Sequence, residues 1–241
     1  MHIPRIYYPQ ELKLGEEIIL KNHYISNVLR MTPGCKIQLF NGKNILFNAE
    51  IMHLDRTQVR IKITNIKEKN CESPLYLHLG QVILRGEKMK FSIQKAVELG
   101  INVITPLFSE RCGVKLTSVE MIKKKQHWKN IAIAACEQCG RNSIPNIRDI
   151  MTLQSWSEES SDSFKINFYP YNNTTRITML PCKIKRFRLL IGPEGGISRK
   201  EMNMVIRSGF INVCMGPRIL RTETATIATI AALQIYFGDL G

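Results

Sequence analysis

The sequence LLIGPEGGIS at residues 189–198 decides the fold class of this chain, together with CMGPRILRTETA at residues 214–225. Each stretch begins in a short apolar run, which is typical of a buried strand, and ends where a helical pattern begins. The run from Phe187 to Ile191 is apolar except at Arg188, as expected for a strand covered on both faces. Two successive strand–loop–helix corners favour an α/β fold in which both loops meet at the carboxyl ends of parallel strands, where such sheets bind ligands.

Local signals support both corners. Gly195 and Gly196 allow a sharp backbone turn and a close approach of a ligand to the main chain. Ser198 and Glu201 have the spacing of a capping box, which predicts a helix that ends at the glycine cap Gly209. A further strand over 210–215 and a buried helix over 224–237 complete the predicted carboxyl-terminal part.

The two loops match neither common pattern for nucleotide phosphates. Neither contains Gly-x-Gly-x-x-Gly, and no Gly-Lys-Ser/Thr follows the glycines. Arg218 and Arg221 bracket the second loop beside Glu223; arginines there are often simply solvated, but two in an otherwise apolar loop favour a ligand. The residues alone therefore indicate a ligand site that is not built for nucleotide phosphate.

The paired loops resemble the signature of the SPOUT methyltransferases and, more narrowly, of the RsmE family, the 16S ribosomal RNA uridine-N3 methyltransferases. The resemblance extends over essentially the whole chain. It includes HYISNVLR at 23–30, FNG at 40–42, RGEKM at 85–89, KAVELG at 95–100, SERC at 109–112 and EQCGR at 137–141. One departure is Lys90, where we expect an acidic residue.

The chain divides into two predicted domains at the charged segment 67–74. Before it, the turn signal NGKN at 41–44 and the alternating run 58–66 predict a small β-rich module. After it, strands over 75–83, 103–106 and 165–169 alternate with helices over 87–99 and 121–139, and 155–163 has the composition of an acidic, serine-rich loop. The resemblance implies a PUA-like RNA-binding β-barrel for 1–72 and a SPOUT methyltransferase domain with a trefoil knot for 73–241.

The composition fits a polyanionic partner. Lysine and arginine number 34 against 20 acidic residues, a formal net charge of +14, which favours nucleic acid, although the abundance of Ile, Lys and Asn leaves genomic bias as an alternative cause. Seven cysteines at irregular spacing, with no signal peptide and no apolar run of about 18 residues, argue against a disulfide framework and a membrane span. Cys136 and Cys139 have the spacing of a metal pair, but no second pair follows, so we expect packing residues, no bound metal and a cytoplasmic protein.

The resemblance also implies a cofactor and a reaction. S-Adenosylmethionine would lie in the two loops, on Ile191, Gly192, Pro193, Glu194, Gly195, Gly196, Met215, Gly216, Ile219, Leu220, Thr224 and Ala225. Methylation at N3 requires loss of the N3 proton, and Arg221 would stabilise the resulting uridine anion while Glu223 orients Arg221 or the substrate. Glu194 is the alternative as a base, and water or no base at all is a third possibility.

The partners follow from the same resemblance. The substrate would be a uridine of 16S ribosomal RNA within the small subunit, contacted by Arg5, His23, Arg30, Arg85 and Lys88, and the protein would be a C2 homodimer without a membrane partner. Two alternatives stay open: a non-catalytic RNA-binding or ribosome-assembly protein of the same fold, and a SPOUT enzyme that acts on transfer RNA. The intact loops favour an enzyme over the first, and the match of the amino-terminal module argues against the second.

Overall fold

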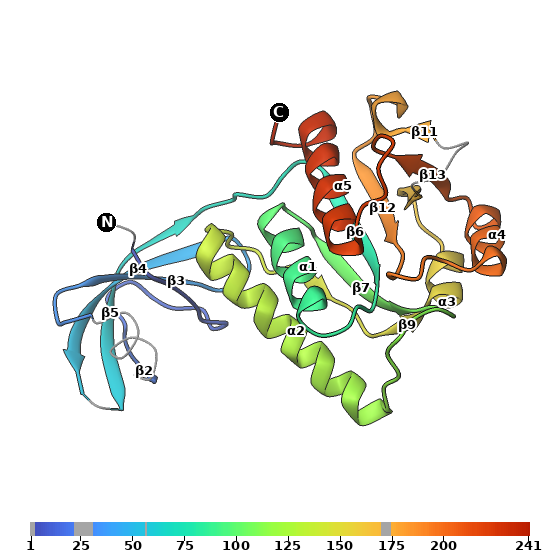
Figure 1. Cartoon of the computed structure of the whole chain (residues 1–241). Helices are drawn as coiled ribbons and strands as arrows, with labels where there is room; N and C mark the ends of the chain where they lie inside the picture. The colour runs from blue at the N-terminus through green and yellow to red at the C-terminus, as the bar shows by residue number, and fades with distance from the viewer. Residues whose placement is uncertain (1–2, 22–30, 56, 170–174) are drawn as a thin grey trace. The chain divides into compact units, whose positions relative to one another are not determined.

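The computed structural model describes residues 3–21, 31–55, 57–169 and 175–241 (Figure 1). Contacts between residues divide the chain into two compact units. The first comprises residues 1–72 and 136–144, and the second comprises 73–135 and 145–241. The chain passes from the first unit to the second between residues 72 and 73, and residues 136–144 group with the first unit. The assignment of 1–72 and 73–241 to an RNA-binding domain and a methyltransferase domain stays a prediction.

The first unit contains a five-stranded sheet in the order β1-β3-β4-β5-β2. β1 pairs with β3 in parallel, and the other pairs are antiparallel. Its strands are β1 (Arg5–Tyr7), β2 (Glu17–Lys21), β3 (Lys36–Phe40), β4 (Ile45–Leu54) and β5 (Gln58–Glu68). Val59, Ile61 and Ile63 are buried in the core, as the alternating pattern predicts.

Polar contacts explain why residues 136–144 belong to the first unit. The Arg5 guanidinium donates to the carbonyl of Arg141 at 3.0 Å and to Oδ1 of Asn142 at 2.7 Å. Asn142 in turn donates to the carbonyl of Lys69 at 2.8 Å, and Arg141 is ion-paired with Glu72. Contacts between residues so far apart cannot be predicted from local sequence patterns, which indicate a boundary only where the composition changes.

The second unit is built on a parallel sheet with the order β11-β13-β10-β12-β6-β7-β8, and β9 pairs with β7 off this path (Figure 1). Its strands are β6 (Tyr76–Val82), β7 (Val103–Phe108), β8 (Asn146–Ile147), β9 (Met151–Thr152), β10 (Phe164–Phe168), β11 (Thr175–Arg176), β12 (Arg186–Ile191) and β13 (Ile211–Cys214). Every described strand pair of this sheet is parallel, which confirms the predicted α/β class. The trefoil knot stays a prediction.

Helices alternate with these strands along the chain. They are α1 (Glu87–Glu98), α2 (Ser118–Cys139), α3 (Leu153–Glu158), α4 (Arg199–Arg207) and α5 (Thr222–Phe237), with a 3₁₀ turn η1 (Ile177–Met179). α1 packs against α5, and α3 against α4. An apolar cluster that includes Leu153, Trp156, Leu190, Val205 and Phe210 fixes α3 and α4 to the sheet.

The predicted loop over 155–163 is partly wrong, because its first residues belong to α3. The Thr152 side chain caps this helix by accepting a hydrogen bond from the Ser155 amide. Leu153 and Trp156 on the same helix are 1% and 0% exposed, so burial of two large side chains outweighs the polar composition of the segment.

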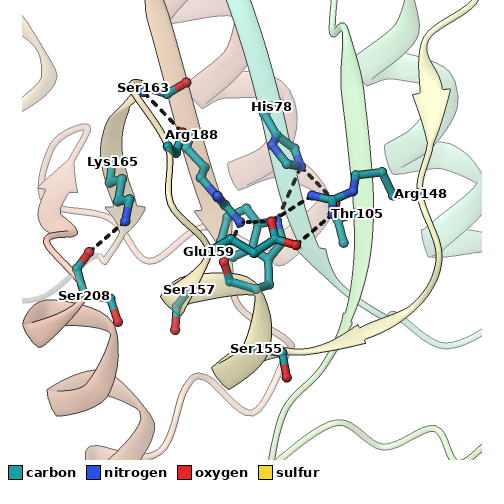
Figure 2. A network of polar contacts seen from close by, with 12 residues as sticks. His78, Thr105, Arg148, Ser155, Ser157, Glu159, Ser163, Lys165, Arg188 and Ser208 are labelled. Carbon is teal, nitrogen blue, oxygen red and sulfur yellow. Dashed lines mark hydrogen bonds and ion pairs between the residues drawn. The ribbon is translucent and has the colours of Figure 1, made fainter.

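A polar network lies buried beside α3 in the second unit (Figure 2). Arg188 of β12 is only 2% exposed, lies 4.2 Å from the centre of the Trp156 ring and donates to Glu159 at 2.8 Å. Arg148 donates to both oxygens of the same carboxylate, at 2.9 and 2.7 Å. Both arginines of the network therefore pair with one shared carboxylate.

His78 of β6 completes the network. The Trp156 indole N–H, which can only donate, lies 3.3 Å from Nε2 of His78, so Nε2 is the acceptor and the ring is neutral. Burial first, and Arg188 second, lower the pKa of His78 to about 3. The hydrogen bonds from Arg148 and Arg188, despite partial burial, lower the pKa of Glu159 to about 2.

Candidate cofactor and substrate site

A cavity of about 890 Å³ opens in the second unit where β10 and β12 end, between the two glycine-containing loops. Its volume is that of a typical small-molecule site. The cavity is lined by Lys88, Arg111, Phe168, Tyr169, Ile191, Gly192, Pro193, Glu194, Gly195, Gly196, Ile197, Arg199, Met202, Ile219, Leu220, Arg221, Thr222 and Ala225. The two loops that the sequence singles out thus form walls of the same cavity.

The first loop connects β12 to α4. Its turn is closed by a hydrogen bond from the Gly196 amide to the Pro193 carbonyl at 2.9 Å, and Gly196 has a φ of 69°, a conformation that favours glycine. The predicted capping box is confirmed: the Ser198 side chain accepts from the Glu201 amide, and the Glu201 carboxylate accepts from the Ser198 amide. The cap fixes where the loop ends and leaves its glycine backbone facing the cavity.

The second loop connects β13 to α5. Gly216 has a φ of 97°, and Arg221 is the N-cap residue of α5, which begins at Thr222, two residues before the predicted start. Thr226 anchors the first turns of this helix by donating to Gln81 of β6 at 2.7 Å, and both side chains are fully buried. A rigid helix start therefore holds Arg221 at the cavity.

Two further walls come from residues that the sequence reasoning did not select. Phe168 and Tyr169 lie at the end of β10, and Arg111 follows β7. Arg111 donates to the carbonyl of Gly195 at 3.1 Å, and the Glu110 amide donates to Glu201 at 2.8 Å. Phe168 at the end of β10 and Arg111 in the loop after β7 lie at the same edge of the parallel sheet as the two loops, and this placement after a strand was the sequence signal that could have identified them.

The predicted cofactor residues fall into two groups. Nine of them line the cavity: Ile191, Gly192, Pro193, Glu194, Gly195, Gly196, Ile219, Leu220 and Ala225. Met215, Gly216 and Thr224 are not among the lining residues. Thr224 lies inside α5, because the helix begins earlier than predicted.

The two predicted catalytic residues differ in their surroundings. Arg221 lines the cavity and is exposed. Glu223 does not line the cavity, and its Oε2 atom is buried without a hydrogen-bond partner in the part of the chain that the structure describes. Arg221 is therefore placed to meet a ligand directly, whereas a role of Glu223 would act through another residue.

The predicted RNA-contacting residues are scattered. Arg5 is 8% exposed and committed to the contacts described above, so we drop it from the candidate RNA surface. His23 and Arg30 lie outside the described residues. Arg85 is exposed and donates to the Gly113 carbonyl at 3.3 Å, while Lys88 lines the cavity and is ion-paired with Glu194 at 3.1 Å.

The residues present fit the cofactor that the resemblance implies. A Cβ atom added at Gly196 or Gly216 would meet no atom within 4 Å, so both loops present bare backbone to open space. Apolar side chains such as Ile191, Leu220 and Met202 supply further walls of the pocket, as is usual for small-molecule cofactors. No group of three or more His, Cys, Asp or Glu side chains that could hold a metal ion occurs among the described residues.

Within the same described ranges, no helix combines the length and the hydropathy that crossing a membrane requires.

Comparisons with known proteins agree along the whole chain. The RNA methyltransferase domain family matches residues 71–234, and the RNA methyltransferase PUA domain family matches 23–64. The ribosomal RNA small subunit methyltransferase E of Buchnera aphidicola subsp. Schizaphis graminum is 50% identical over 242 residues, which cover 99% of this chain and 98% of that protein.

Solved structures are similar as well. A protein from Legionella pneumophila, in complex with the bound cofactor SAM, has a TM-score of 0.95 at 41% identity, with 100% of each chain covered. The ribosomal RNA small subunit methyltransferase E from Neisseria gonorrhoeae, bound to S-adenosyl methionine, has a TM-score of 0.92 at 34% identity, again with 100% of each chain covered. From its fold, its cavity and these matches, the chain belongs to the ribosomal RNA small subunit methyltransferase E family.

Proposed function

We propose that this protein is an S-adenosylmethionine-dependent methyltransferase that methylates N3 of a uridine in 16S ribosomal RNA of the small ribosomal subunit. The observation that carries the proposal is the single cavity shared by both signature loops, with Arg221 at its wall. Membership of the methyltransferase E family supplies the reaction class and the substrate class. Ribosomal RNA as substrate leads us to infer that the protein acts in the cytoplasm.

The backbone of both loops would hold the cofactor. Ile191, Gly192 and Gly196 line the cavity from the first loop, and Leu220 and Ala225 from the second. When bound there, S-adenosylmethionine supplies the methyl group. Backbone amides and carbonyls suit this ligand, because they read its polar edges without adding fixed charge beside its sulfonium.

Arg221 would lower the barrier for loss of the N3 proton. The uridine anion spreads its charge over the carbonyl oxygens beside N3, and an arginine preorganised near those oxygens stabilises the charge as it develops. Glu194 is already ion-paired with Lys88 at 3.1 Å, so we assign it no proton transfer and let the N3 proton pass to solvent. We assign Glu223 a positioning role toward Arg221 or the substrate, for which its buried Oε2 atom, without a hydrogen-bond partner among the described residues, is available.

Access to N3 constrains the RNA. This atom lies on the Watson–Crick edge, so the target base must be unpaired or extruded before it reaches the cavity. The net charge of +14 suits a polyanionic surface such as the assembled small subunit.

We also propose a C2 homodimer, as the SPOUT resemblance implies. Exposed apolar side chains on the packed pair α1 and α5 support it: Phe91 is 42%, Ile235 53% and Tyr236 55% exposed. Light scattering should give twice the 27.7 kDa chain mass; a monomer at assay concentration would contradict this part of the proposal.

Transfer of a tritiated methyl group from S-adenosylmethionine tests the function. Small ribosomal subunits, free 16S RNA and transfer RNA serve as parallel substrates, and nucleoside analysis identifies the product. We expect 3-methyluridine in 16S RNA alone. Label in transfer RNA would point to the transfer RNA enzyme, and tight RNA binding without transfer would point to the assembly protein.

A further inference from the structure

The charge of the cavity wall exceeds what the cofactor needs. Lys88, Arg111, Arg199 and Arg221 all line it, and of the described lining residues Glu194 alone carries a carboxylate. Glu194 is paired with Lys88 at 3.1 Å, so the three arginines face the cavity region without a balancing acid. In the part of the chain that the structure describes, no ion pair involves any of the three.

Arg199 occupies an adverse position for helix stability. It is the first residue of α4, where the positive end of the helix dipole disfavours cations. By contrast, Arg207 lies in the last turn of the same helix, where the dipole favours it. The amides of the α4 start are already served by the capping box, so Arg199 contributes neither a cap nor a favourable dipole contact. Its placement indicates a ligand.

Arg111 approaches the same wall from the loop after β7. It donates one hydrogen bond, from Nη1 to the Gly195 carbonyl at 3.1 Å, and its guanidinium carries further donors. The adjacent Glu110 amide is held by Glu201 at 2.8 Å, and Glu201 is 7% exposed. Arg111 is therefore fixed at the cavity by two contacts to the first loop and to α4.

The cofactor itself does not neutralise these arginines. At neutral pH S-adenosylmethionine has a sulfonium, an ammonium and one carboxylate, so it brings a further net positive charge into the cavity. A cavity that must accept this ligand beside three arginines needs an anion from the other substrate. A nucleic acid backbone supplies such anions, and arginine forks match phosphate oxygens in geometry.

We propose that Arg111 and Arg199 form a phosphate-binding subsite for the RNA strand that carries the target uridine. This inference rests on the proposed function, since it assumes that RNA approaches the cofactor cavity. Binding of the phosphodiester beside the cavity would place the uridine base toward Arg221 and the methyl donor. The subsite would also couple the two substrates, because the phosphate offsets the positive charge that S-adenosylmethionine adds.

The test compares Arg199→Gln with the matched control Lys200→Gln. Both changes remove one positive charge from neighbouring exposed positions of α4, but Lys200 does not line this cavity. For Arg199→Gln we expect the KM for small subunits to rise roughly tenfold, as for loss of one charge-assisted hydrogen bond. The slope of log affinity against log salt should become shallower by about 0.7 to 0.9. Lys200→Gln should change the KM for small subunits by less than about twofold.

The affinity for S-adenosylmethionine in the absence of RNA shows whether Arg199 binds an RNA phosphate or the carboxylate of the cofactor. We expect its Kd to stay unchanged or to tighten in Arg199→Gln, because a repelling charge is removed. A severalfold weaker cofactor affinity with an unchanged subunit KM would overturn the proposal and assign Arg199 to the cofactor carboxylate. Equal KM values for Arg199→Gln and Lys200→Gln would overturn it as well.

Arg111→Gln is a second, independent variant with the same expected pattern. The wild-type protein in the same assay separates this inference from the proposed function: methyl transfer by the wild type with no defect in either arginine variant refutes the subsite alone. Absence of transfer by the wild type refutes the function, whereas the salt dependence of RNA binding still tests the subsite.

Discussion

Arginines occur in two contrasting settings within the second unit. Arg188 is 2% exposed, stacks on Trp156 and shares the Glu159 carboxylate with Arg148. Arg221 and Arg199 are exposed at the cavity, and neither has an ion-pair partner among the described residues. The difference shows where to look for ligands. A buried arginine that is paired with a carboxylate of the protein stabilises the fold, whereas an exposed arginine beside a cavity, without such a partner, is available to bind an anionic ligand.

The largest effect on cofactor binding should come from a side chain that fills the cavity. Gly196→Trp places an indole in the cavity at a position with a φ of 69°, and we expect no measurable S-adenosylmethionine binding by calorimetry. Gly209→Trp is the matched control, since Gly209 has a φ of 87° and an open surface position outside the cavity. An equal loss of affinity in the two variants would show that backbone strain decides binding, and wild-type affinity in both would overturn the assignment of the first loop to the cofactor site.

Substitutions in the buried network should lower the free energy of unfolding. Trp156 is fully buried, stacks on Arg188 and donates to His78, and a Cβ added at Gly80 would lie 2.5 Å from its ring. Trp156→Ala should therefore lower the free energy of urea unfolding by about 3 to 5 kcal/mol. Gln154→Ala, an exposed change on the same helix, should cost less than about 0.5 kcal/mol. Similar losses in both would mean that α3 contributes only through helix formation.

The network also predicts a gradual effect, a loss of stability in acid. His78 is held neutral by a pKa of about 3, against an ordinary value of 6.5, so the unfolded chain binds its proton first. Stability should fall as the pH falls from about 6.5 to about 3, by about 1.4 kcal/mol per pH unit at most. Glu159, with a pKa of about 2 against 4.5, adds a further loss as the pH falls below about 4.5.

Unfolding curves at several pH values measure this dependence. His78→Gln should flatten the slope between pH 6 and 4 while the response below pH 4.5 persists. An unchanged slope in the variant would mean that another group takes up the proton.

Sequence patterns were sufficient for the local structure of the site. The capping box of Ser198 and Glu201 and the apolar run before Gly192 depend on neighbours in the chain, so the positions of both signature loops follow directly. Nine of the cofactor candidates line the cavity for the same reason. Periodicity likewise places the core of β5 at Val59, Ile61 and Ile63.

Other features depend on contacts between distant segments. Arg5 looks like a surface cation in the sequence, but its partners Arg141 and Asn142 lie more than 130 positions away. α3 was missed because its stabilisation comes from Trp156 packing on the sheet and not from local propensity. Arg111 reaches the cavity only because parallel pairing brings the end of β7 to the same edge as the first loop.

The comparison is tested most directly by removing one arginine from each setting and measuring both activity and stability. Arg221→Met and Arg188→Met conserve the apolar stem and remove the charge. For Arg221→Met we expect methyl transfer to small subunits to fall by about 10²- to 10³-fold in kcat, with S-adenosylmethionine affinity and unfolding free energy nearly unchanged. For Arg188→Met we expect a loss of unfolding free energy, because Glu159 loses one of its partners, with kcat preserved in the folded fraction. The reverse pattern, a stability loss at Arg221 or a kcat loss at Arg188, would contradict the division of roles.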